Sequence, residues 1–168
     1  MNTTAQKQTS HDDSEIALLR HTLATVAYRA GKALRGVPED FPKFKAGPKT
    51  RTPGEILAHL SDLYDWALTQ CEGRQAWRET PPTDWAADTQ RLFVALAKVD
   101  GYLASGSPLG MAPAQLFQGA IADSLTHIGQ INILRGIAGS SVRAENYCRA
   151  EIVAGRVGAE QAPPKLEF

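Results

Sequence analysis

Apolar residues recur at helical spacing in four separate segments of this chain. The first segment starts at Ser14 and is interrupted by Gly36 and Pro38, which are typical of a helix end. Its apolar stripe comprises Ile16, Leu19, Leu23, Val26, Ala27, Ala30 and Leu34. This spacing matches one face of an α-helix, so the pattern predicts a first helix from Ser14 that stops before Gly36.

The second segment opens with a helix-start signal. Thr52 can cap the helix, Pro53 suits its first position, and Glu55 can complete a capping box. The helix is predicted to run to about Glu72. Its apolar face comprises Ile56, Leu60, Leu63, Trp66 and Ala67. His59 lies in the middle of that face, where helical periodicity favours an apolar side chain.

Two further helices follow. Thr83 or Asp84 caps the third, which continues to about Leu103, and Pro113 opens the fourth, which continues to about Ala138. No segment has the alternating pattern of a strand, and no internal repeat is present. The sequence therefore predicts an all-α four-helix bundle.

The segments outside the four helices suggest the domain organisation. Residues 1–13 are polar and predict a disordered tail. Residues 14–153 form the bundle, with a short extra C-terminal helix within residues 142–153. Residues 154–168 carry Gly and Pro and predict a loose C-terminal tail. A chain of 168 residues is ordinary for one such domain.

The charge balance narrows the classes of partner. Lys plus Arg number 18 and Asp plus Glu number 18, so the formal net charge is zero. Binding to nucleic acid or to an anionic membrane needs clustered positive charge, and we expect neither partner. No apolar run approaches the length of a membrane span or of a signal peptide. Cys71 and Cys148 have no metal-like or redox-like spacing, which predicts a reduced cytoplasmic protein, although a disulfide between them stays open.

Three polar residues lie on the inward faces of two predicted helices. Asp123 and His127 are at i and i+4 of the fourth helix, so their side chains project the same way. His59 comes from the inward face of the second helix. Two imidazole nitrogens and one carboxylate oxygen suit zinc or nickel, and also iron. Three protein ligands would leave one position open, as in a catalytic metal site.

Each of these residues also has a simpler interpretation. A single inward His is usually a hydrogen-bonded core residue, and Asp123 with His127 can form an ion pair across one turn. Asp62 can orient the imidazole of His59, or it can be an ordinary surface carboxylate at the face boundary. Gln130 borders the Asp123/His127 face as a second supporting candidate. Residues 145–147 can fold over the bundle as a lid or form a packed C-terminal turn.

Two short motifs resemble the DinB-like superfamily of four-helix bundles, also called the DinB/YfiT type. They are residues 51–60 (RTPGEILAHL) and residues 127–135 (HIGQINILR), and helix order and spacing agree over most of residues 14–140. The resemblance implies that His59 is the first metal ligand and His127 the last. Asp123 stands where the family usually has His. The site can therefore have a different metal preference, or the chain has lost its metal.

The resemblance also implies a class of activity. Members of this superfamily are similar to thiol-dependent transferases and isomerases, in which the metal would hold a low-molecular-weight thiol as thiolate. Metal-activated water performing hydrolysis is the second chemistry. We therefore expect a metal-dependent transferase or hydrolase acting on a small-molecule substrate. The alternative is a non-catalytic binding or dimerisation module, and a homodimer is expected for a bundle of this size.

Overall fold

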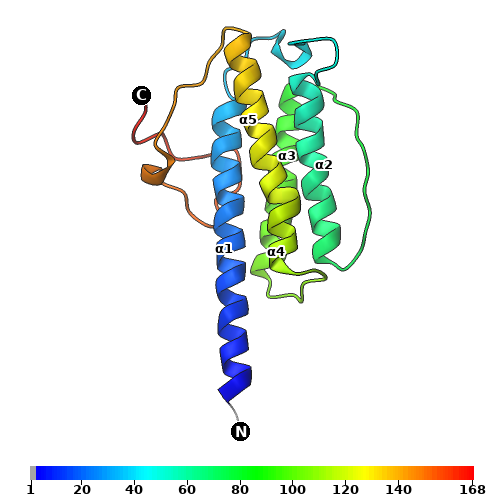
Figure 1. The fold of residues 1–168 in the computed structure, drawn as a ribbon, viewed down its shortest axis with the longest axis vertical. Helices are drawn as coiled ribbons and strands as arrows, with labels where there is room; N and C mark the ends of the chain where they lie inside the picture. Colours follow the sequence, from blue (N-terminus) through cyan, green and yellow to red (C-terminus); the bar gives the residue numbers. More distant parts are fainter. Residues whose placement is uncertain (1–2) are drawn as a thin grey trace.

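Four long helices run alongside one another in the structure of this chain, which is a computed structural model describing residues 3–168, with side chains from Asp13 onward (Figure 1). The long helices are α1 (Thr3–Leu34), α2 (Pro53–Cys71), α3 (Trp85–Ala104) and α5 (Ala122–Ile137). Short pieces complete the fold: η1 (Phe41–Lys43), α4 (Pro113–Leu116), η2 (Phe117–Ile121) and η3 (Tyr147–Arg149). Within the described range the chain forms no strand, and the all-α prediction is confirmed.

One apolar core lies between the four long helices, and each helix contributes buried apolar side chains to it. The fully buried side chains include Leu23 of α1, Leu57 and Leu60 of α2, Leu92 and Leu96 of α3, and Ile128 and Ile131 of α5. Burying each such side chain stabilises the fold by about 1.5–3 kcal/mol. Helix α2 packs most extensively on α3, so α2 has one side on α3 and another toward α5.

The start of α2 is fixed by the predicted capping box. The Thr52 hydroxyl accepts a hydrogen bond from the Glu55 amide at 3.2 Å, and the Glu55 carboxylate accepts one from the Thr52 amide at 2.6 Å. Gly54 is needed beside this cap, because a Cβ there would lie only 3.0 Å from the carbonyl oxygen of Pro42. Such a cap stabilises a helix by about 1 kcal/mol, and here it sets where α2 begins and therefore the direction in which His59 points.

The predicted last helix, from Pro113 to Ala138, is wrong as one continuous element. The chain is interrupted at Gly119, whose φ of −81° and ψ of −106° are non-helical, and a π-helical turn, η2, joins α4 to α5. Glycine tolerates this backbone because it has no Cβ. The regular helix begins only at Ala122, directly before Asp123, so the π turn sets the register of the residues that follow.

Helix α1 begins before Ser14, where the apolar pattern starts, and projects beyond the other helices toward the N-terminus (Figure 1). The disordered tail predicted for residues 1–13 stays a prediction. Residues 1–2 lie outside the described residues, and only the backbone of residues 3–12 is described. Among the residues that the structure describes, no helix is both long enough and apolar enough to cross a membrane.

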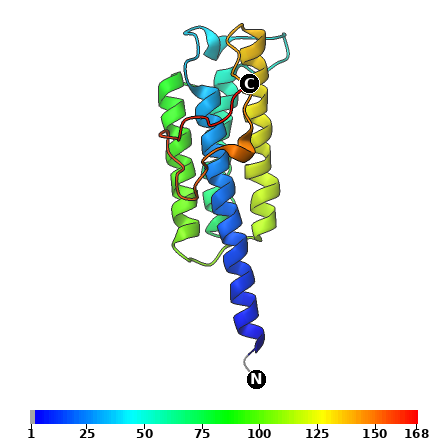
Figure 2. The ribbon, with the colours of Figure 1, turned by 90° about the vertical axis from the view of Figure 1, so that its left-hand side faces the viewer.

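The C-terminal segment packs on α1 and does not hang free. Figure 2 shows residues beyond 140 crossing the outer side of α1. The predicted extra helix within residues 142–153 is reduced to the three-residue turn η3. The Asn146 amide donates to the Leu166 carbonyl at 3.0 Å, the Phe168 amide donates to the Ala144 carbonyl at 3.0 Å, and Val157 is buried.

A buried ionic cluster anchors this segment. Lys32 of α1 donates to Glu145 and to Glu167, each at 2.7 Å, and Tyr28 donates to Glu145 at 2.6 Å. Burial opposes the charge of Lys32, but its hydrogen bonds to the two carboxylates outweigh burial, and the pKa of Lys32 is raised. Glu145 therefore belongs to a packed turn against α1, and of the two interpretations of residues 145–147 the structure favours this one over a lid.

Candidate metal centre

His59, Asp123 and His127 meet between α2 and α5. The Nε2 atom of His127 lies 3.5 Å from Oδ2 of Asp123, and the Nε2 atom of His59 lies 3.8 Å from the same oxygen. The two imidazole rings are 4.8 Å apart between centroids and nearly perpendicular, at 88°. The predicted spatial convergence of these three side chains is therefore present, although they come from helices more than sixty positions apart in the sequence.

Helical phase explains the convergence. Asp123 and His127 are one turn apart on α5, so both project toward α2. His59 is surrounded on α2 by the buried residues Leu57, Ala58 and Leu60, which hold this part of α2 in the core. Because α2 and α5 pack on each other, the three polar side chains come together at the edge of that contact.

Gln130 fixes the orientation of one imidazole. Its side-chain oxygen lies 2.8 Å from Nδ1 of His127. An amide oxygen can only accept, so Nδ1 carries the hydrogen and donates it, which leaves the lone pair of His127 on Nε2, the nitrogen that faces Asp123. Metal-ligating His residues commonly have such an outer partner, and Gln130 has the contact expected of one.

The surroundings keep His59 uncharged. Burial is the largest cause that lowers the pKa of His59 from its ordinary value of 6.5; the neighbouring His127 and Arg51 lower it further, and Asp123 and Asp62 only partly oppose this. The imidazole of His59 is therefore neutral at pH 7 and keeps a nitrogen lone pair. A neutral imidazole is the form that binds a metal ion.

The site is partly open to solvent. The Asp123 side chain is 45% exposed, that of His59 20% and that of His127 11%. Three surface hollows reach the site, one beside each residue: about 420 Å³ beside His59, 490 Å³ beside His127 and 450 Å³ beside Asp123. A small molecule can therefore approach the three ligand atoms, which a closed structural site would not allow.

The loop between α2 and α3 forms a wall of the site, which sequence reasoning missed. The ring of Trp77 lies edge-on to His59, with centroids 5.6 Å apart, and edge-on to Trp66 at 5.8 Å. Trp66 also donates a hydrogen bond to Gln75 of the same loop at 3.3 Å. Trp77 lies outside any periodic segment, so no helical pattern could place it beside His59.

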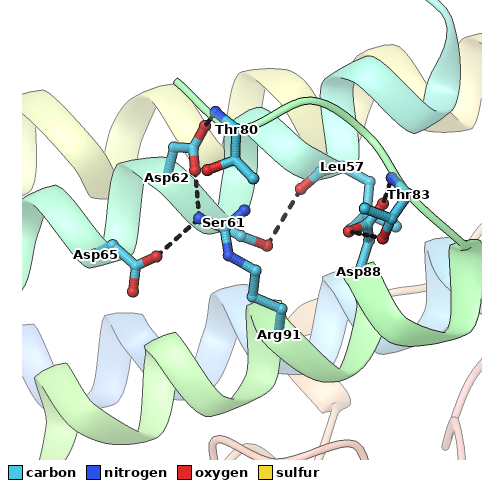
Figure 3. A network of polar contacts seen from close by, with 8 residues as sticks. All are labelled: Leu57, Ser61, Asp62, Asp65, Thr80, Thr83, Asp88 and Arg91. Carbon is cyan, nitrogen blue, oxygen red and sulfur yellow. Dashed lines mark hydrogen bonds and ion pairs between the residues drawn. The ribbon is translucent and has the colours of Figure 1, made fainter. Parts of the chain in front are cut away.

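Asp62 is buried, so of its two interpretations the ordinary surface carboxylate is wrong. Its carboxylate accepts a hydrogen bond from the Thr80 amide at 2.8 Å and pairs with the guanidinium of Arg91, which also binds Asp65 at 2.8 Å (Figure 3). These contacts tie the α2–α3 loop to α2 and α3. Asp62 makes no hydrogen bond to His59, so its contribution to that imidazole is electrostatic and through the position of the loop.

The chemistry of the donor set fits a divalent ion. Ligand atoms around one tetrahedral zinc ion lie about 3.4 Å apart, because each is about 2.1 Å from the metal. The separations of 3.5 and 3.8 Å to Asp123 are close to this spacing, and all three ligand atoms lie within 4.8 Å of one another.

The three ligand atoms that face one another also take part in no hydrogen bond with the described residues. Across the described part of the chain, the carboxylate of Asp123 accepts no hydrogen bond, and neither Nε2 atom donates or accepts one. Two imidazole nitrogens and a carboxylate oxygen that lie at such spacing without a hydrogen bond are an arrangement that a cation would satisfy.

Comparisons with protein-family models, with curated proteins and with solved structures find no match to this chain. The function must therefore be argued from the site itself.

Proposed function

We propose that this chain is a divalent-metal-dependent enzyme of the DinB-like four-helix-bundle type, acting on a small molecule in the cytoplasm. His59, Asp123 and His127 hold the ion, which is zinc or nickel, with iron as a further candidate. The observation that carries the proposal is the convergence of both Nε2 atoms on one oxygen of Asp123, with no hydrogen bond using those lone pairs among the described residues.

The non-catalytic alternative predicts a buried, hydrogen-bonded Asp123–His127 pair. Instead, the two side chains are 3.5 Å apart and the Asp123 side chain is 45% exposed. Both features support the enzyme over the binding or dimerisation module. Cys71 and Cys148 are both free thiols, which agrees with a reducing compartment.

A divalent ion at this position would lower the pKa of a bound thiol or water and so supply a nucleophile at neutral pH. The protein residues do the rest. Gln130 holds His127 in the tautomer that presents Nε2, and burial keeps His59 neutral. The carboxylate of Asp123 reduces the net charge of the site by one relative to three His ligands, which moderates the acidity of the bound group.

Metal analysis of protein purified without a polyhistidine tag tests the proposal. After incubation with zinc and removal of free ion, we expect about one zinc ion per chain, and His127→Ala should lose it. His21→Ala is the matched control, because His21 is an exposed His on α1 and should leave the zinc content unchanged. A folded wild-type chain that retains no zinc, nickel or iron would contradict the proposal.

Cobalt substitution distinguishes the two chemistries. In the thiol-dependent transferase, adding a small thiol such as cysteine to the cobalt-loaded chain should produce a sulfur-to-cobalt charge-transfer band, because the thiolate becomes a ligand. His127→Ala should abolish the band. A cobalt spectrum that does not respond to thiols, together with hydrolysis of a chromogenic ester by the zinc-loaded chain, would favour the hydrolase.

A further inference from the structure

Arg51 lies at the junction of two of the hollows that reach the metal centre. It lines the hollow beside His59, together with Glu55 and Glu79, and it lines the hollow beside His127. We call the second one the His127 hollow. Its wall is formed by Arg51 and His127 and by the apolar side chains of Ile56, Ile133, Leu134 and Ile137. Arg51 is therefore within reach of any molecule that approaches either imidazole.

The guanidinium of Arg51 has no direct partner among the described residues, although its charge adds to the Thr52 hydrogen bonds that lower the pKa of Glu55. In the described part of the chain, its guanidinium forms no hydrogen bond and no ion pair. Glu55, which lines the hollow beside His59 with Arg51, directs its carboxylate to the Thr52 amide in the capping box. Arg51 is also the one formally charged residue in the wall of the His127 hollow. A guanidinium offers a planar fork of donors that matches a carboxylate.

Most of the remaining wall of the His127 hollow is apolar, with Thr50 and Gln130 as its other polar residues. Ile133 and Ile137 are one turn apart on α5 and are 65% and 60% exposed. They stand beside the buried Leu134 and Ile56, so an apolar ligand placed here would contact a continuous apolar wall. A volume of about 490 Å³ lies within the range of small-molecule sites.

We propose that the His127 hollow binds a small apolar carboxylic acid, with its carboxylate on Arg51 and its hydrocarbon part over Ile133 and Ile137. The charge complementarity at Arg51 and the apolar wall together select this occupant. The role of such an acid as substrate rests on the proposed function, because its reactive group would then face the ion beside His127. Its binding does not, since neither Arg51 nor the two isoleucines are metal ligands.

Ligand titrations followed by two-dimensional NMR test the binding directly. The probes are hexanoate, hexan-1-ol and hexylammonium, which share a hydrocarbon chain and differ in charge. They are added to the full chain in the presence of a chelator, so that no carboxylate binds through a metal ion. We expect hexanoate to bind about tenfold more tightly than hexan-1-ol, since it alone gains a charge-assisted pair with Arg51, and hexylammonium to bind most weakly.

Variants then assign the two parts of the site. Arg51→Gln should remove the preference for hexanoate over hexan-1-ol while leaving hexan-1-ol binding unchanged. Ile137→Ser should weaken the binding of both probes. Both variants should fold, because the side chains of Arg51 and Ile137 are exposed and lie outside the core. Lys98→Gln, at an exposed cation on α3, is the control and should keep the wild-type preference.

Two results would overturn the proposal. One is an equal affinity of the wild-type chain for hexanoate and hexan-1-ol. The other is a dimer in sedimentation that Ile137→Glu dissociates, with no probe binding, because a second copy would then cover the apolar wall. Zinc binding is measured separately by calorimetry on chelator-free samples of the same proteins. Loss of zinc binding alone therefore contradicts the proposed function, and loss of the carboxylate preference alone contradicts this inference.

Discussion

Two polar clusters of this protein differ in whether the chain itself supplies hydrogen-bond partners for their polar groups. The cluster of Lys32, Glu145, Glu167 and Tyr28 is closed: the side chains of Lys32 and Glu145 are 7% and 0% exposed, and their charges meet each other through hydrogen bonds. The cluster of His59, Asp123 and His127 is open: its three ligand atoms face one another, and the Asp123 side chain is 45% exposed. The closed cluster holds a segment in place, whereas the open cluster has unused lone pairs.

Removing a member of the closed cluster should have the largest effect on stability. Glu145→Ala leaves the hydroxyl of Tyr28 without its acceptor and Lys32 with only the more exposed Glu167. Breaking a buried ion pair by removing one partner costs about 3–5 kcal/mol, and the remaining Glu167 places the expected loss near 3 kcal/mol. Urea unfolding measures it.

Glu160→Ala is the matched control for that variant, because Glu160 is an exposed carboxylate of the same C-terminal segment. It should change the free energy of unfolding by less than about 0.5 kcal/mol. Equal effects of Glu145→Ala and Glu160→Ala would contradict the anchoring role of the closed cluster.

An added metal ion should stabilise the protein through the open cluster. Loss of the Asp123 carboxylate should change the stability of the metal-free protein very little. Zinc at a free concentration of one hundred times its Kd should stabilise the wild-type chain by about 2.7 kcal/mol through mass action. Asp123→Asn should lose most of this gain. Its metal-free stability should stay within about 0.5 kcal/mol of wild type, because the exposed Asp123 carboxylate accepts no hydrogen bond from the described residues.

Thermal melts with and without zinc measure the gain, with His21→Ala as the control that keeps the full response. A wild-type melting temperature that zinc, nickel and iron all leave unchanged would remove the distinction between the two clusters.

Asp62 and Asp65 allow a buried carboxylate and an exposed one to be compared at the same guanidinium, that of Arg91. Both bind Arg91, but the Asp62 side chain is 1% exposed and that of Asp65 is 46% exposed (Figure 3). Asp62→Ala should cost about 2 kcal/mol, since a buried hydrogen-bonded charge is lost, and Asp65→Ala under about 1 kcal/mol. Asp62→Ala should also speed hydrogen exchange at the Thr80 amide, which donates to Asp62. Equal costs for the two variants would contradict the burial argument.

The features that periodicity controls could be predicted from the sequence. Helical phase predicted that His59, Asp123 and His127 share inward faces; the structure brings them together, but at the edge of the α2–α5 contact with Asp123 half-exposed. The capping box at Thr52 fixes the register of the helix that carries His59. Helical phase then determines which residues share a face. The spatial convergence of the three residues followed from phase alone, whereas the binding of an ion stays a prediction.

The features that depend on loops and on tertiary contacts could not be predicted. Trp77 reaches His59 from a segment with no periodicity, and Asp62 is buried because Arg91 and Thr80 come from elsewhere in the chain to meet it. The break at Gly119 depends on backbone angles that an apolar pattern does not encode. Glu145 lies against Lys32 only because the C-terminal segment folds back across α1.

The smallest expected effect is the pH dependence of the open cluster. Burial, then the neighbouring His127 and Arg51, lower the pKa of His59 below 6.5, so its lone pair stays available at pH 7 and is lost to a proton only on acidification below that value. Zinc affinity should therefore fall as the pH drops below 6.5, through proton competition at the ligands.

Arg51→Gln removes one of the charges that lower the pKa of His59, so this pKa should rise toward 6.5 and competition at His59 should begin at a higher pH. NMR titration of the His59 ring protons in metal-free protein measures the pKa directly, and Lys98→Gln should leave it unchanged. A His59 pKa that is the same in wild type and in Arg51→Gln would place Arg51 too far from the imidazole to act on it, and would also weaken the case that one small ligand contacts both.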